Sequence, residues 1–261
     1  MGVEVFFEDI LRAREILRSV SYVTPVKTNA ELDALTSAAV FLKCETAQRT
    51  GSFKFRGAYY AASQVVAKGL GRTVATISSG NHGQGLALAA SLLNLSAYVI
   101  VPKPYVPRKQ LAIAQHGAHV IVVEDRAAAD QALHETIAHE NAWQIHAFND
   151  PQVIAGQGTI MLELLQQVSD LDVVLGPVGG GGLLSGLCIA AHHLNPHLLL
   201  YACEPLGLMI WLVQRKPWNR WRYSSTNHGE HVVITQIYRN VLKQIARYGI
   251  VKAEHTTPRE F

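Results

Sequence analysis

One lysine, Lys54, stands in a setting that favours amine chemistry. It belongs to the stretch TGSFKFRG at residues 50–57, after a small-residue turn and at the start of a predicted helix over residues 55–68. The positive end of a helix macrodipole favours the neutral form of an amine, and a neutral amine can attack an aldehyde to form a Schiff base. Taken alone, Lys54 would be read as a solvated surface lysine. The chemical interpretation therefore depends on two further motifs.

The first motif, SSGNHGQG at residues 78–85, follows a predicted strand over residues 73–77 and precedes an Ala/Leu-rich helix over residues 86–93. A turn of this kind leaves backbone N–H groups unpaired at the start of the helix. Together with the serine hydroxyls, they form a site for an anion such as a carboxylate. The simpler interpretation is an ordinary turn in which Asn81 only caps the helix.

The second motif, GPVGGGGLLSG at residues 176–186, lies between a predicted strand over residues 172–175 and a helix over residues 183–194. Four consecutive glycines are costly in conformational entropy, and they are useful where backbone amides must approach a phosphate. The run fits neither a Walker A loop nor a dinucleotide fingerprint. A flexible linker is the alternative, but linkers are Gly/Ser-rich over longer spans. We therefore expect a phosphate cradle.

An amine for an aldehyde, a carboxylate site and a phosphate cradle would together serve pyridoxal 5′-phosphate (PLP) and an amino-acid substrate. At these motifs the chain resembles the fold-type II PLP enzymes, and within them the serine racemase and serine/threonine dehydratase group. The resemblance covers residues 5 to about 205. It rests on residues 43–45, 50–58, 78–84, 155–159, 179–182 and 203–205.

The resemblance implies a two-base mechanism. Lys54 would hold PLP as a Schiff base and then remove the Cα proton of the substrate. Ser79 would return a proton to the opposite face, whereas dehydratases of the group often have alanine there. The remaining binding residues are also carried over by resemblance: Phe53 (cofactor ring), Asn81 (cofactor O3′ and substrate), Gly179, Gly180, Gly181 and Gly182 (phosphate), and Ser78, Ser79 and His82 (substrate carboxylate).

Strand-like and helix-like stretches alternate along the chain, which predicts an α/β fold with parallel sheets covered by helices on both faces. The expected strands fall near residues 40–44, 72–77, 96–101, 118–123, 171–176 and 198–203. The resemblance implies a two-domain, tryptophan synthase β-like architecture with the cofactor in the cleft between the domains. A large domain would comprise residues 1–69 plus 150–205, with a small domain inserted at residues 70–149.

Residues 206–261 differ in composition from the rest. They carry nine Lys/Arg and three Glu, a net charge of +6, against +3 for the whole chain. Such a change marks a boundary, and residues 237–248 fit an amphipathic helix. A basic, aromatic-rich tail could indicate nucleic-acid binding. We favour a foreign tail that arose by alternative splicing, a frameshift or a gene-model error.

Two expected features of the family have no match in this tail. We find no counterpart of the small hydroxyl residue that bonds the pyridine nitrogen, so the C-terminal part of the large domain is expected to be incomplete. A divalent-cation site, for Mg²⁺, would begin at Glu204. Its next positions hold Leu208, Met209 and Ile210, and hard cations need oxygen ligands. The metal site is therefore expected to be weakened.

The predicted function is a serine racemase with serine dehydratase side activity, and threonine is a candidate second substrate. The alternative is a truncated, inactive PLP-binding isoform that modulates a full-length partner. We expect a homodimer or pairing with such a homologue, and a weak match at Gln84 and Lys109 suggests ATP as an effector.

The hydrophobic content of 49% and charged content of 16% are typical of compact globular proteins. No apolar run reaches membrane-spanning length, and the first residues lack the pattern of a secretory signal. The three cysteines show no C-x-x-C spacing and are expected to be reduced. We therefore expect a cytoplasmic protein without a membrane or nucleic-acid partner.

Overall fold

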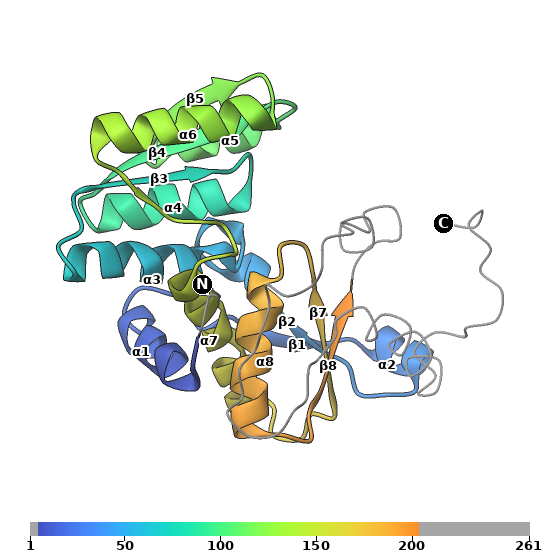
Figure 1. The fold of residues 1–261 in the computed structure, drawn as a ribbon. Coiled ribbons are helices and arrows are strands. Elements are labelled where there is room, and N and C mark those ends of the chain that lie inside the picture. The colour runs from blue at the N-terminus through green and yellow to red at the C-terminus, as the bar shows by residue number, and fades with distance from the viewer. Residues whose placement is uncertain (1–4, 204–261) are drawn as a thin grey trace, which may run out of the picture.

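The computed structural model describes residues 5–203, in which helices and strands alternate (Figure 1). The α-helices are α1 (Phe7–Leu17), α2 (Ala30–Thr36), α3 (Lys54–Ala67), α4 (Asn81–Leu92), α5 (Pro107–Gln115), α6 (Arg126–Glu140), α7 (Pro151–Gln167) and α8 (Gly182–Leu194). The strands are β1 (Val26–Thr28), β2 (Phe41–Lys43), β3 (Thr73–Ile77), β4 (Ser96–Pro102), β5 (His119–Val123), β6 (Trp143–Gln144), β7 (Val173–Pro177) and β8 (Leu199–Cys203). Two short 3₁₀ turns are η1 (Glu45–Ala47) and η2 (Arg49–Gly51).

A four-stranded parallel sheet with the order β5-β4-β3-β6 is covered on both faces. Alternate residues of β4 point to opposite sides: Val99 joins the main core, whereas Ile100 joins a second core under α6. Helices α4 and α5 add Leu86 and Ile113 to the main core. The predicted α/β class, with helices on both faces of a parallel sheet, is confirmed.

Two smaller sheets lie beside α7 and α8 (Figure 1). Strands β7 and β8 pair in parallel, as predicted, while β1 and β2 pair antiparallel. The antiparallel pair differs from the all-parallel expectation. Strands β1 and β6 were not predicted, because segments of three and two residues are too short to show an alternating pattern.

Helix α7 is the central packing element below the parallel sheet (Figure 1). It begins after Asp150, whose carboxylate accepts hydrogen bonds from the backbone amides of Gln152 and Val153. Its residues from 153 to 162 are all buried, because α7 packs against α1, α3 and α8. An apolar helix enclosed in this way forms a rigid support for α3 and α8.

All four strands of the parallel sheet lie between residues 73 and 144, within the range predicted for the small domain. The division into two domains stays a prediction. The basic tail, its predicted helix over residues 237–248 and Glu204 lie outside the described residues. Within residues 5–203, no helix is both long and apolar enough to cross a membrane.

Candidate active site

Lys54 is the first residue of α3, and its side chain is partly buried. Its Nζ donates a 2.8 Å hydrogen bond to the backbone carbonyl of Ala147 and lies 5.2 Å from the centroid of the Phe53 ring. Burial lowers the pKa of the Lys54 amine to about 8, because a low-dielectric setting disfavours the charged form. The sequence suggested the helix dipole as the cause, and Lys54 does begin α3. Burial is a further cause that favours the neutral amine.

Two close helix crossings fix the backbone around Lys54. On α4, a Cβ atom at Gly85 would lie 3.1 Å from the amide nitrogen of Phe55 and 3.2 Å from the carbonyl carbon of Lys54. On α7, a Cβ atom at Gly156 would lie 2.6 Å from the Cα of Gly57. A Cβ atom would be tight at Gly85 and would clash at Gly156, so α4 and α7 both approach α3 backbone to backbone. The first turn of α3 is thereby held from two sides.

The turn before α4 is organised by Ser78. Its Oγ accepts hydrogen bonds from the amides of Gly80, at 3.3 Å, and Gly83, at 3.0 Å. Ser78 therefore caps the helix, which is the role that the simpler interpretation gave to Asn81. Asn81 is instead the exposed first residue of α4, and Ser79 is partly buried beside it. Amides at this helix start suit a carboxylate, which would compete with the Ser78 hydroxyl for them.

His82 is buried, with 3% of its surface exposed, and its Nε2 lies 3.3 Å from the carbonyl oxygen of Ile145. A carbonyl only accepts, so we assign the ring proton to Nε2. Burial, with the nearby charge of Lys54, lowers the pKa of His82 to about 3. The described part of the chain offers Nδ1 no hydrogen-bond partner. The ring is thus neutral, and its free nitrogen is an acceptor that cannot donate to a carboxylate.

Residues 145–148, which the sequence analysis did not single out, connect the predicted site residues. Ile145 and Ala147 supply the carbonyl oxygens that His82 and Lys54 contact. The Nδ1 of His146 accepts hydrogen bonds from the backbone amides of Phe148, at 3.3 Å, and Asn149, at 3.0 Å. These bonds stabilise the bend of the chain at residues 147–149. The only available signal was position, since this segment follows β6 at the carboxyl edge of the sheet, where α/β ligand sites form.

The four glycines at the start of α8, residues 179–182, serve different purposes. A Cβ atom at Gly180 would overlap the Phe148 ring, and one at Gly182 would lie 2.7 Å from the Phe148 carbonyl oxygen. Gly181 has a φ of +86° and is the N-cap of α8, a conformation that favours glycine. At Gly179 a Cβ atom would meet nothing within 4 Å. Two glycines are therefore needed for close packing on Phe148, which the sequence analysis did not foresee.

These residues fit PLP. The first-turn amides of α8 lack intrahelical partners, which suits a phosphate, and open space lies beside Gly179. Lys54 provides a partly buried amine of lowered pKa for the aldehyde, with the Phe53 ring nearby. The turn at residues 78–83 offers amides and hydroxyls for a substrate carboxylate.

The sequence model of a known protein family, described as pyridoxal-phosphate dependent enzyme, matches residues 18–248. The chain belongs to this family of PLP-dependent enzymes. The match continues beyond residue 205, where we expected the resemblance to stop. The family membership that the three motifs predicted is confirmed, and PLP dependence follows from it.

Individual relatives of this PLP-dependent chain are racemases and lyases. A serine racemase of Dictyostelium discoideum is 42% identical over 204 residues, which cover 78% of this chain and 63% of the relative. An L-threo-3-hydroxyaspartate ammonia-lyase of Pseudomonas sp. is also 42% identical over 204 residues, covering 76% and 63% of the two chains. The crystal structure of serine racemase from Dictyostelium discoideum superposes with a TM-score of 0.74 at 43% identity, covering 78% and 66%. The chain thus spans about 63% of the length of the relatives compared by sequence.

Proposed function

We propose that this chain is a PLP-dependent serine racemase with serine dehydratase side activity, and with threonine as a second dehydratase substrate. The observation that carries the proposal is the amine of Lys54, which is partly buried, has its pKa lowered to about 8 and bonds to the Ala147 carbonyl. The similarity to serine racemases and an ammonia-lyase supports the same chemistry.

In this proposal Lys54 would hold PLP through its amine, Phe53 would lie near the cofactor ring and Asn81 would bind its O3′. The amides of Gly179, Gly180, Gly181 and Gly182 would hold the phosphate. When bound, PLP supplies an electron sink for the electron pair left by the broken Cα–H bond. The protein's own contribution is to orient that bond and to move the proton.

The substrate carboxylate binds at the turn before α4. Ser78, Ser79 and Asn81 would contribute their side chains or amides, and His82 would contribute its backbone amide because its ring nitrogen is an acceptor. With its Nζ neutral, Lys54 would take the Cα proton of the substrate. Ser79 Oγ gives a proton back from the opposite face, which inverts the centre. Loss of the serine hydroxyl before reprotonation leads instead to pyruvate and ammonia.

The alternative, an inactive PLP-binding isoform that modulates a full-length partner, is less favoured, because the relatives are racemases and ammonia-lyases. A chiral separation of serine after incubation of the purified chain with PLP and L-serine tests the proposal. We expect D-serine and pyruvate to accumulate, and neither to form with Lys54→Ala. Bound PLP without either product would support the inactive isoform.

Further features of the proposal concern partners and location. We propose self-association or pairing with a full-length homologue, a weakened Mg²⁺ site beginning at Glu204, and a cytoplasmic location. ATP as an effector would involve Gln84 and Lys109. In support, the Nζ of Lys109 lies 3.7 Å from where a Cβ atom of Gly80 would be. A cation beside this turn could pass the effect of a bound anion to the substrate site.

A further inference from the structure

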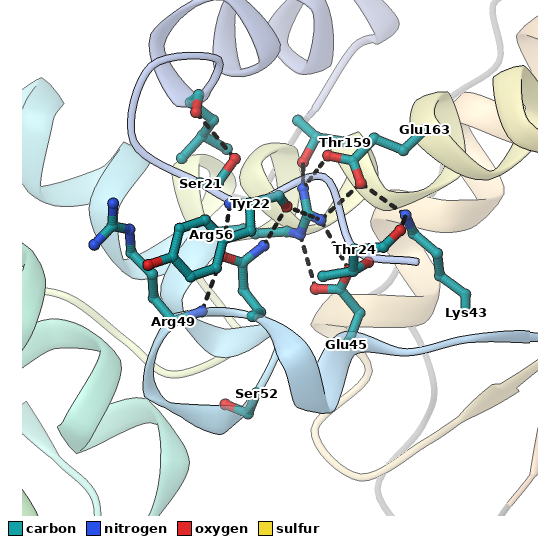
Figure 2. A network of polar contacts seen from close by, with 12 residues as sticks. Ser21, Tyr22, Thr24, Lys43, Glu45, Arg49, Ser52, Arg56, Thr159 and Glu163 are labelled. Atoms are coloured by element: carbon teal, nitrogen blue, oxygen red, sulfur yellow. Dashed lines mark hydrogen bonds and ion pairs between the residues drawn. The ribbon is translucent and has the colours of Figure 1, made fainter. Parts of the chain in front are cut away.

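A buried ion-pair network surrounds Arg56, two residues after Lys54 on α3 (Figure 2). The Arg56 side chain has 0% exposure. Its Nε and Nη2 donate to the two carboxylate oxygens of Glu45, at 2.8 Å each. Its Nη1 and Nη2 donate to the two oxygens of Glu163, at 2.7 and 2.9 Å. Arg56 thus makes two bidentate pairs, which constrain direction as well as distance.

These pairs tie the first turn of α3 to two other parts of the chain. Glu45 lies in η1 and Glu163 lies on α7. Burial alone would raise the pKa of Glu163, but hydrogen bonds and charge from Arg56, with Lys43, outweigh burial and lower it. A lowered pKa favours the ionised form of Glu163, which is the form that accepts both hydrogen bonds from Arg56.

The first turn of α3 has no acidic residue of its own to compensate its positive charges. It contains Lys54 and Arg56 but no acidic residue, and the N-cap residue Phe53 makes no side-chain capping bond. Two cations at the positive end of a helix dipole are unfavourable. The carboxylates of Glu45 and Glu163 offset the charge of Arg56, and they do so from outside the helix.

A neighbouring ion pair provides an internal comparison. Lys43 donates to Glu163, at 2.8 Å, to the Gln167 side chain, at 2.9 Å, and to the Thr24 carbonyl, at 2.8 Å. Its side chain is 8% exposed. The described residues that Lys43 contacts in this way belong to α7 and the segment before β1, and none belongs to α3. Lys43 and Arg56 share Glu163 as a partner, but only Arg56 belongs to α3, the helix that carries Lys54.

We propose that Arg56 is a positioning residue for Lys54, whose two bidentate pairs hold the first turn of α3 so that the Lys54 amine stays beside the Ala147 carbonyl. The inference rests on the proposed function only in taking Lys54 as the reacting amine. Within residues 5–203, the titratable groups near Lys54 are His82 from α4 and His146 from the segment after β6, and the charge of Lys54 contributes to lowering the pKa of each. Neither histidine can supply a negative charge that would stabilise the charged amine. The pKa of Lys54 therefore depends on how deeply the amine is buried.

The test measures the pKa of the Lys54 amine in the absence of PLP. The full chain is labelled with trinitrobenzenesulfonate over a range of pH, and modification of the Lys54 peptide is followed by mass spectrometry. The midpoint of the pH profile reports the protonation of Lys54 independently of catalysis. The first variant is Arg56→Lys, which keeps the charge but cannot form bidentate pairs because it lacks the planar guanidinium group. The second is Glu45→Gln, which leaves Arg56 paired with Glu163 and so is the milder change. Lys43→Met is the matched control, because it breaks a buried ion pair on the shared Glu163 but leaves both bidentate pairs of Arg56 in place, and within the described residues Lys43 itself makes no hydrogen bond to α3.

We expect the midpoint near pH 8 for the unaltered chain and for Lys43→Met, although the melting temperature of Lys43→Met falls. In Arg56→Lys the midpoint should rise by about one unit, a tenfold change in the protonation equilibrium, and in Glu45→Gln it should rise less. The proposal is overturned if both variants keep the original midpoint, or if Lys43→Met shifts it as far as Arg56→Lys. Because PLP is absent, a chain without racemase activity still decides the question.

Discussion

The amine of Lys54 donates a 2.8 Å hydrogen bond to the backbone carbonyl of Ala147, although the two residues are 93 positions apart. This contact joins the start of α3 to the segment that leaves the parallel sheet after β6. The same segment provides the carbonyl of Ile145 to His82 and the ring of Phe148 to the glycine run. Residues 145–148 are therefore the common contact of the three motifs that the sequence singled out.

Gly180→Ala should weaken both folding and PLP binding, because the added Cβ would overlap the Phe148 ring. Overpacking of this kind typically costs about 1–3 kcal/mol. For folding, Gly179→Ala is the matched control in the same loop, since its Cβ would meet nothing within 4 Å. It is not a control for PLP binding, because its Cβ would enter the open space proposed for the phosphate. Denaturant unfolding and PLP titration measure both effects. In a Phe148→Ala background the cost of Gly180→Ala should largely disappear, and an unchanged cost there would refute the steric explanation.

Gly156→Ala should destabilise the protein, which is the reverse of the usual result inside a helix. A helical Gly→Ala change ordinarily stabilises by about 0.5–1 kcal/mol. Here the Cβ would lie 2.6 Å from the Cα of Gly57 and would force α3 and α7 apart. We expect a loss of about 2 kcal/mol or more, in the upper part of the range for single substitutions, as measured by chemical denaturation. Stabilisation by this variant would show that the two helices are not in backbone contact.

Ser79→Ala should separate the two proposed activities. Without the hydroxyl there is no group to return a proton to the second face, while Lys54 can still remove the Cα proton. Racemisation should fall by about 10²–10⁴-fold, the usual contribution of a general acid, and pyruvate formation should persist. Parallel assays of D-serine and pyruvate provide the comparison. Full racemase activity in Ser79→Ala would rule out the two-base assignment.

His82 should remain neutral throughout the physiological range, because its pKa in the folded protein is lowered to about 3. The unfolded chain takes up a proton near pH 6.5 that the folded protein does not bind, so stability falls as the pH drops from about 6.5 towards 3. We expect His82→Gln to show a weaker pH dependence of the melting temperature over this interval. An NMR titration of His82 with a midpoint near 6.5 would contradict the buried, neutral ring.

Much of this fold follows from local sequence patterns. The strand predicted near residues 96–101 is β4, and the helix predicted for residues 183–194 is α8 with one additional residue. Both have long apolar patterns bounded by turn residues, which is the situation in which periodicity is informative. Strands β1 and β6 were missed because neither is long enough to have a period.

The site was only partly predictable, for a physical reason. Lys54 has a side chain with a reactive amine, and the glycine run is recognisable because its residues have no side chains. The chemistry of both can therefore be inferred from the sequence. Ala147 and Ile145 act through backbone carbonyls, which every residue possesses, and no residue type identifies them. Similarly, the glycine at position 180 was explained by a ligand, whereas its nearest neighbour is Phe148.

The visible absorption spectrum of the full chain with PLP, recorded as a function of pH, tests the role of Lys54 most directly. With a pKa of about 8, Lys54 is about one-tenth neutral at pH 7 and half neutral at pH 8. The rate at which the protein-bound cofactor band forms should therefore rise with pH to a midpoint near 8, and L-serine should shift the band. Lys54→Ala should show no such band. A band of equal strength in Lys54→Ala, or a rate midpoint near that of an ordinary lysine, would contradict the assignment of Lys54 as the cofactor amine.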